Sequence, residues 1–146
     1  MEVFYFTYTG TSKKIAETLA GELGVEVKEI SAPCLPYFVW LLFSFFPGLP
    51  IKANFSLPRA SSFVLCFPKW TFNCPPVTYF FRILKRCGLR FEKIVLVISY
   101  RGWKEKPFVR LYQKLARGIA RKVEVFIILQ KDWETQVKNL LVEGRL

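Results

Sequence analysis

The 146-residue chain fits one domain, 1–146, and its composition of 52% hydrophobic and 17% aromatic residues is enough for a sizeable core. Its 22 Lys and Arg residues against 11 Asp and Glu residues give a formal charge of +11, which favours acidic proteins, anionic lipid, nucleic acid or a phosphorylated cofactor as partners. Histidine is absent and the four cysteines are far apart, which disfavours structural zinc, a disulfide scaffold and histidine-dependent hydrolysis.

Five apolar segments predict the strands of a sheet. In chain order they are residues 3–6, 25–30, 63–67, 94–98 and 123–129. The second is weaker, and the fifth is interrupted by Glu124; the other three are continuous apolar runs rather than alternating ones, as is typical of parallel strands buried on both faces. The first run begins at the N-terminus with no basic segment ahead of it, so we expect no secretory signal and a cytoplasmic protein.

Segments with apolar residues at helical spacing separate these strands. They cover residues 15–23, closed by Gly24; 77–84, behind Pro75 and Pro76; 108–119, behind Pro107; and 133–141, capped by Asp132. This alternation predicts an α/β fold, in which helices cover both faces of a five-stranded parallel sheet in one right-handed, doubly wound domain. Ligands of such sheets bind beyond the carboxyl ends of the strands, so we expect a site in the loops after the first, third and fourth strands.

One segment has a different character. No charged residue occurs from Ser31 to Ile51, and apolar side chains from Tyr37 to Phe46 would surround any helix formed there. The segment is too short to span a membrane, which takes about 20 apolar residues. We expect a second crossover helix buried between the sheet and its neighbours. The alternatives are a patch that dips into a bilayer or docks a partner, and partial disorder.

A run of hydroxyl side chains lies between the first strand and the first helix. It consists of Thr7, Tyr8, Thr9, Gly10, Thr11 and Ser12, followed by two lysines. A helix N-terminus offers unpaired N–H groups and partial positive charge, and small hydroxyl residues around a glycine let an anion approach the backbone. The alternative is an ordinary helix start capped by Thr9 or Thr11. The glycine patterns of P-loops and dinucleotide-binding folds are absent.

The sequence FTYTGTSKKIAETLA resembles the phosphate-binding loop of the flavodoxin family, whose pattern is [ST]-x-T-G-x-[ST]. Thr7, Thr9, Gly10, Thr11 and Ser12 match it, and chain length and strand–helix alternation agree over nearly the whole domain. The resemblance implies a three-layer flavodoxin-like fold with strand order 2-1-3-4-5. It also implies non-covalently bound FMN, with the phosphate on Thr7 to Ser12 and the isoalloxazine between the loops after the third and fourth strands.

These two loops supply the remaining candidate residues for FMN. The first comprises Pro68, Lys69, Trp70, Thr71, Phe72 and Asn73, and the second contains Ser99, Tyr100, Gly102 and Trp103. Trp70 is similar in position to the aromatic residue that packs on the flavin in many flavodoxins; the alternative for Trp70 and Phe72 is packing in the core or at the helix entry. Tyr100 and Trp103 are candidates for the second wall, Ser99 for a bond to the ring edge and Gly102 for a tight turn.

A row of basic residues follows the predicted fourth helix. Arg110, Lys114, Arg117 and Arg121 recur at steps of four, three and four, which places them on one side of that helix. The row is either a solvated face or a docking surface for an acidic redox protein or anionic headgroups.

The resemblance implies a cytoplasmic FMN-dependent electron carrier, an oxidoreductase more by electron transfer than as a stand-alone enzyme. One alternative is a dehydrogenase at the inner face of the membrane that passes electrons to a quinone, using Tyr37 to Phe46 as its contact. Another is a flavin-free binding module on the same fold. Nucleic acid is a less favoured partner, because most aromatic residues follow core periodicity.

Overall fold

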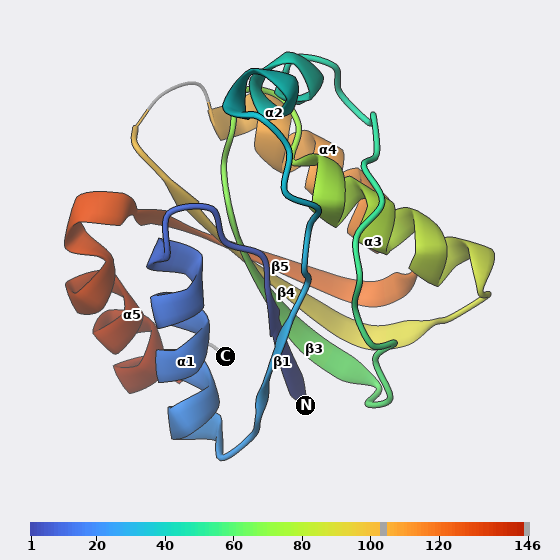
Figure 1. Ribbon diagram of the computed structural model, residues 1–146. Coiled ribbons are helices and arrows are strands. Elements are labelled where there is room, and N and C mark those ends of the chain that lie inside the picture. Colours follow the sequence, from blue (N-terminus) through green and yellow to red (C-terminus); the bar gives the residue numbers. More distant parts are fainter. Residues whose placement is uncertain (103–104, 145–146) are drawn as a thin grey trace.

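A five-stranded parallel sheet lies at the centre of the computed structural model, which describes residues 1–102 and 105–144 (Figure 1). Its strands are β1 (Glu2–Tyr5), β2 (Val27–Glu29), β3 (Ser62–Pro68), β4 (Phe91–Tyr100) and β5 (Ala120–Leu129). They pair in the order β2-β1-β3-β4-β5, and every pair is parallel. The predicted fold class and strand order are therefore confirmed.

Helices cover both faces of the sheet and complete three layers (Figure 1). α1 (Thr11–Leu23) and α5 (Trp133–Val142) lie on one face, and α3 (Pro75–Arg86) and α4 (Glu105–Arg117) lie on the other. The short α2 (Tyr37–Ser44) sits at one end of the molecule, and a 3-10 turn, η1 (Gln130–Asp132), joins β5 to α5. Pro75 and Pro76 occupy the first turn of α3, and Gly24, with φ 69°, ends α1, both as predicted.

Two apolar cores lie above and below the sheet because successive strand residues point to opposite faces. Phe4, Phe63 and Phe80 belong to the core under α3 and α4, whereas Val3 and Val64 belong to the core under α1 and α5. The Phe80 ring lies 4.8 Å from that of Phe55, and the rings of Phe4, Phe63 and Phe81 lie within 5.5–5.8 Å of it. The continuous apolar strand runs are explained by this burial on both sides.

α4 ends earlier than its apolar pattern predicts. The helix stops at Arg117, before Gly118, and Ile119 lies in the turn that leads into β5. The Ile119 amide donates to the Ala116 carbonyl (3.1 Å), and the Phe91 amide donates to the Ile119 carbonyl (2.8 Å). Arg121 is therefore on β5 and not on the fourth helix, and its guanidinium lies 3.5 Å from the Glu92 carboxylate. The basic row on α4 consists of Arg110, Lys114 and Arg117, all exposed.

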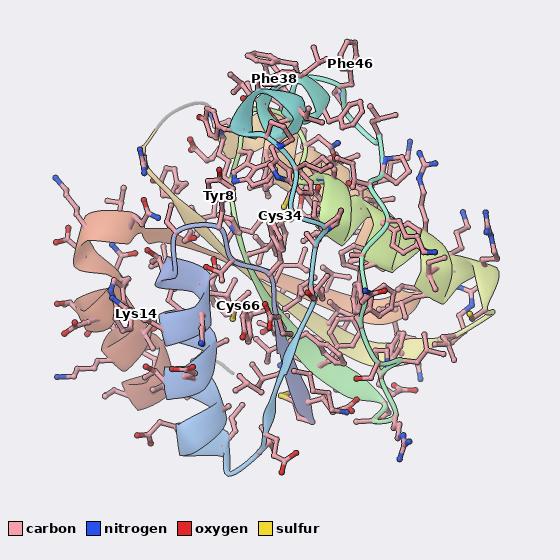
Figure 2. All side chains as sticks on the ribbon, viewed as in Figure 1. Tyr8, Lys14, Cys34, Phe38, Phe46 and Cys66 are labelled. Carbon is pink, nitrogen blue, oxygen red and sulfur yellow. The ribbon has the colours of Figure 1, made fainter. Side chains whose placement is uncertain are left out.

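α2 is exposed, so the prediction of a buried crossover helix is wrong. α3 and α4 already cover one face of the sheet, and α1 and α5 cover the other. α2 is therefore left to pack at one end of the molecule (Figure 1). Only Trp40 and Ser44 of α2 are buried. Phe38 and Phe46 point away from the body of the molecule (Figure 2). None of the helices in the described ranges is both long and apolar enough to cross a membrane.

A buried polar cluster joins α2 to α3 and α4. The Asn73 amide donates to the carbonyls of Leu49 (2.7 Å) and Phe43 (3.3 Å). Its carbonyl oxygen accepts from the hydroxyls of Thr78 (2.5 Å) and Tyr112 (3.2 Å). Because both ends of the Asn73 amide are bonded, this one side chain fixes the turn after α2 to the two helices.

The cysteines differ in burial. Cys66 on β3 and Cys74 at the start of α3 are buried, whereas Cys34 and Cys87 are exposed, and all four are free thiols. Burial raises the pKa of the Cys66 and Cys74 thiols far above the ordinary value. These two residues therefore behave as small apolar side chains in the cores.

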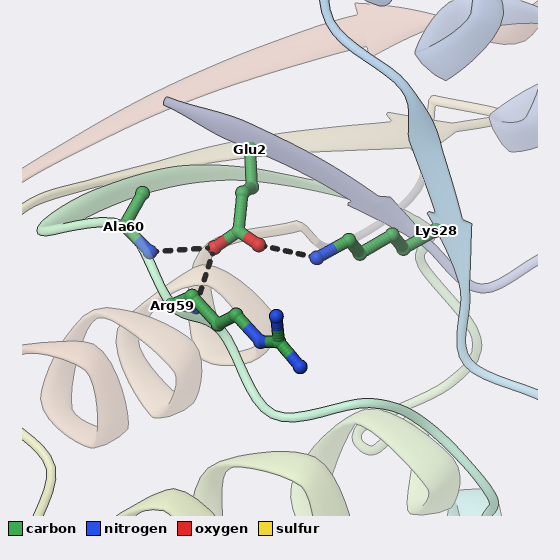
Figure 3. Close-up of polar contacts among 4 residues, drawn as sticks. All are labelled: Glu2, Lys28, Arg59 and Ala60. Atoms are coloured by element: carbon green, nitrogen blue, oxygen red, sulfur yellow. Dashed lines mark hydrogen bonds and ion pairs between the residues drawn. The ribbon is translucent and has the colours of Figure 1, made fainter.

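Glu2 joins three segments at the amino-terminal edge of the sheet (Figure 3). One carboxylate oxygen accepts from the Lys28 ammonium on β2, and the other accepts from the amides of Arg59 (2.8 Å) and Ala60 (2.9 Å). Burial alone would raise the pKa of Glu2, but these bonds outweigh it and hold the pKa below its ordinary value.

We expect Glu2→Gln to lower the free energy of unfolding at neutral pH by about 1 kcal/mol, because the charge-assisted bonds are lost. A lowered folded-state pKa stabilises the fold above the unfolded pKa, near 4.5, and this contribution is lost as pH falls through the folded value. Urea unfolding of both proteins between pH 7 and pH 3 should therefore show the difference shrinking in acid. A difference that stays constant with pH would contradict this role of Glu2.

Candidate functional site

The loop after β1 turns sharply at Gly10. Gly10 occupies the position before the first residue of α1 with φ 98°, a left-handed conformation that glycine adopts without strain. The Gly10 amide donates to the Thr7 hydroxyl (2.8 Å). No side-chain cap is formed, so neither Thr9 nor Thr11 caps the helix. Thr7 therefore stabilises the turn that presents the start of α1.

The first turn of α1 offers backbone N–H groups without acceptors. In the described part of the chain, the amides of Thr11, Ser12 and Lys13 donate no hydrogen bond to the protein. The Ser12 side chain is buried, and its hydroxyl lies 3.2 Å from that of Ser99 at the end of β4. Lys13 lies 4.0 Å from Glu17, one turn further along. Neutral donors thus dominate this helix end, which is suited to an anion.

Gln130 contacts the hydroxyls of this loop. Its side-chain amide nitrogen lies 3.1 Å from the Thr11 hydroxyl oxygen and 3.3 Å from that of Thr9. The Arg101 guanidinium donates to the Gln130 carbonyl oxygen (3.0 Å). The loops after β4 and β5 are therefore connected to the loop after β1. Gln130 was not among the predicted site residues, because its only signal in the sequence is its place directly after the last strand.

A cavity of about 390 Å³ opens beside this loop at the carboxyl ends of the strands. Such a volume is within the usual range for ligand pockets. Eight predicted site residues line it: Tyr8, Thr9, Pro68, Lys69, Trp70, Thr71, Ser99 and Tyr100. Six further lining residues were not among the predicted site residues: Tyr37, Trp40, Leu41, Ser44, Arg101 and Gln130. Four of these come from α2, which helps to form one wall.

Trp70 is the centre of the aromatic wall. Its ring lies edge-on to those of Tyr8 (5.6 Å, 89°), Trp40 (5.6 Å, 64°) and Phe6 (5.7 Å, 76°). Tyr8 in turn lies 6.1 Å from Tyr37. These contacts fix the Trp70 ring between α2 and the segment that follows β1, so the wall is formed before any ligand arrives.

Other predicted site residues lie outside the cavity lining. Thr7, Gly10, Thr11 and Ser12 form the adjoining loop described above. Phe72 faces Phe45 (6.4 Å) and its amide donates to the Ser44 carbonyl (2.8 Å), while Asn73 belongs to the buried polar cluster. Gly102 has φ 99° and forms a turn, as predicted, but does not line the cavity. Trp103 lies outside the described residues.

Positive charge is concentrated at the cavity. Lys69 and Arg101 line it, and within residues 1–102 and 105–144 no acidic residue does. Partial burial lowers the pKa of Lys69, although Glu105 opposes the shift, and its ammonium donates to the Trp70 carbonyl (2.9 Å). Aromatic walls, two cations and an adjoining anion site are suited to a flat, largely apolar ligand with a negatively charged group.

Comparisons with known proteins agree with this architecture. No family model matches the chain. An uncharacterized protein of Archaeoglobus fulgidus is 40% identical over 131 residues, which cover 90% of this chain and 86% of that protein.

Solved structures show the same fold at low sequence identity. A flavoprotein of Lactobacillus acidophilus in complex with FMN is 15% identical and superposes with a TM-score of 0.67 over 91% of this chain and 93% of its own. A flavodoxin of Streptococcus pneumoniae is also 15% identical, with a TM-score of 0.51 over 97% of each chain. The chain therefore belongs to one family with the Archaeoglobus fulgidus protein, and its fold is the flavodoxin-like fold.

Proposed function

We propose that this protein is a flavodoxin-like electron-transfer protein that binds FMN. The observation that carries the proposal is that the open amides at the start of α1 adjoin an aromatic cavity at the carboxyl ends of the strands. The fold comparison supports it, because the Lactobacillus acidophilus flavoprotein of the same fold was solved with FMN.

Each part of FMN has matching groups in the chain. The amides of Thr11 to Lys13 and the hydroxyls of Thr9 and Thr11 would hold the phosphate, with the Gln130 amide as a neighbouring donor. Trp70 and Tyr100 would flank the ring and exclude water from it. Bound FMN would supply one- and two-electron chemistry, and the protein would bind and orient it.

The cavity favours a carrier over a stand-alone enzyme. Among the described residues that line it there is no carboxylate and no imidazole, the groups that most often transfer protons in catalysis. An acidic redox protein is the partner that we propose for the exposed α4 row of Arg110, Lys114 and Arg117.

A second candidate function is a membrane-associated dehydrogenase that reduces a quinone. It is favoured by α2, whose residues Tyr37, Trp40 and Leu41 line the cavity, while neighbouring apolar side chains are exposed. Sustained turnover of a soluble quinone by the FMN-loaded protein would favour this enzyme. Electron exchange with an acidic redox protein, with salt-sensitive rates, would favour the carrier.

Titration of the purified apoprotein with FMN and with riboflavin tests the proposal. We expect FMN to bind at least tenfold more tightly, because only FMN carries the phosphate. Thr11→Val should weaken FMN binding about tenfold, since it removes one hydrogen bond to a charged group, and should leave riboflavin affinity unchanged. Flavin fluorescence quenching measures both affinities.

Thr18→Val is the matched control, because the Thr18 hydroxyl lies on α1 and bonds the Lys14 carbonyl (2.9 Å), away from the cavity lining. Its flavin affinities should equal those of the wild type. Equal affinity for FMN and riboflavin in the wild type would refute the phosphate site. Failure to bind either flavin would support the flavin-free binding module instead.

A further inference from the structure

We propose that α2 and the turn after it insert into the headgroup region of an anionic bilayer. We call residues 37–46 the apolar cap. Six of its large apolar side chains are exposed: Tyr37, Phe38, Leu41, Leu42, Phe45 and Phe46. Single exposed apolar residues are common, but a contiguous group of this kind marks an interaction surface.

The apolar cap projects from the fold rather than forming a groove. Phe38 is 68% exposed, and Leu42 and Phe46 are each 54% exposed. Figure 2 shows Phe38 and Phe46 at the outer end of the molecule, directed away from the sheet. A protruding helix with aromatic and leucine side chains is the shape that penetrates a bilayer interface without crossing it.

The cap is held firmly on its inner side. The Phe72 amide donates to the Ser44 carbonyl (2.8 Å), and the hydroxyls of Ser44 and Thr71 lie 3.2 Å apart. The Asn73 amide bonds the Phe43 carbonyl (3.3 Å), and Trp40 is buried. Since these contacts order the helix before it meets a surface, binding would not have to overcome the entropy of folding the segment.

Charge identifies an anionic bilayer as the partner. Two basic residues, Lys69 and Arg101, line the cavity together with Tyr37 and Leu41 of the cap. The Arg82 guanidinium donates to the carbonyl of Gly48, two residues after the cap. Apolar side chains that insert into a bilayer bind it stably when basic residues lie nearby and contact anionic headgroups.

Membrane docking would also orient the cavity. Tyr37, Trp40 and Leu41 line the cavity from α2, so docking by the cap would place the cavity mouth close to the lipid headgroups. The bilayer contact itself does not depend on FMN. Only the statement that the cavity near the bilayer holds FMN rests on the proposed function.

Flotation of the purified full chain with lipid vesicles tests the inference. We expect binding to vesicles of equal parts phosphatidylglycerol and phosphatidylcholine. Binding to pure phosphatidylcholine vesicles should be at least tenfold weaker. Added salt should weaken binding to the vesicles that contain phosphatidylglycerol. Phe38→Glu and Phe46→Glu should each reduce binding to anionic vesicles by about tenfold or more, because an inserted Phe is replaced by a charge.

Val142→Glu is the control, because Val142 on α5 is also exposed and apolar but lies outside the cap. It should float like the wild type, and all variants should keep wild-type circular dichroism. Absence of flotation, or equal flotation of Phe38→Glu and wild type, would overturn the inference. Self-association that Phe38→Glu abolishes, without vesicle binding, would show that a second copy covers the cap. FMN titration of the same samples separates this result from failure of the proposed function.

Discussion

Phe80→Ala is expected to lower the free energy of unfolding by about 3–5 kcal/mol. Phe80 is fully buried in α3, and four aromatic rings surround it: Phe4 from β1, Phe63 from β3, Phe81 and Phe55. Alanine would remove the ring and leave a cavity that such rigid neighbours cannot fill. Urea unfolding followed by circular dichroism gives the free energy.

The adjacent Tyr79→Ala variant is the matched comparison. Tyr79 is only half-buried, and in the part of the chain that the structure describes its ring contacts one other ring, that of Phe55, at 6.2 Å. Tyr79→Ala should lower the free energy of unfolding by less than half as much as Phe80→Ala does. If the two variants were equally destabilised, the core under α3 and α4 could not be organised around Phe80. Because domains are stable by only about 5–15 kcal/mol, Phe80→Ala should also be close to unfolding at elevated temperature.

Asn73→Ala is expected to lower the free energy of unfolding by about 2–4 kcal/mol and to loosen α2 in the native state. The substitution removes all four hydrogen bonds of the side chain and leaves buried groups of Thr78 and Tyr112 without one of their partners. It also frees the carbonyls of Phe43 and Leu49, which the amide holds. Amide hydrogen exchange should therefore accelerate across residues 37–49 even without denaturant.

Tyr112→Phe separates the two effects of Asn73→Ala. It removes one hydroxyl from the same buried cluster but keeps both bonds from the Asn73 amide to the turn after α2. We expect global destabilisation by about 1–3 kcal/mol with unchanged exchange in α2. Faster exchange of α2 in both variants would mean that the cluster as a whole, and not the Asn73 amide, holds the helix.

The fold was predictable from sequence because its local signals agree with its global packing. Continuous apolar runs gave the strands, and paired prolines and closing glycines marked helix ends, as at Pro75 and Gly24. The loop after β1 could be found for the same reason, since Thr7 to Ser12 is a polar run at the end of a buried strand. Eight of the cavity residues followed from knowing which strand ends meet.

The remaining features depend on tertiary placement. A helix that is apolar on all sides, such as α2, carries no signal of which side faces the core, so its exposure could not be predicted. Gln130 reaches Thr9 and Thr11 across the sheet edge, a contact between distant segments that no local pattern records. Arg121 was misplaced because the basic spacing continued beyond Gly118, although that glycine could have signalled the helix end.

The four cysteines should differ in their reactivity, because two are buried and two are exposed. Thiolates rather than thiols react with alkylating reagents, so Cys66 and Cys74, whose pKa values are raised by burial, should remain unlabelled in the folded protein. A maleimide dye would attach at Cys34 and Cys87. Cys34 lies in the segment that leads into α2, and Cys87 follows the last residue of α3. The native chain thus already carries one attachment point close to α2 and a reference point at the end of α3.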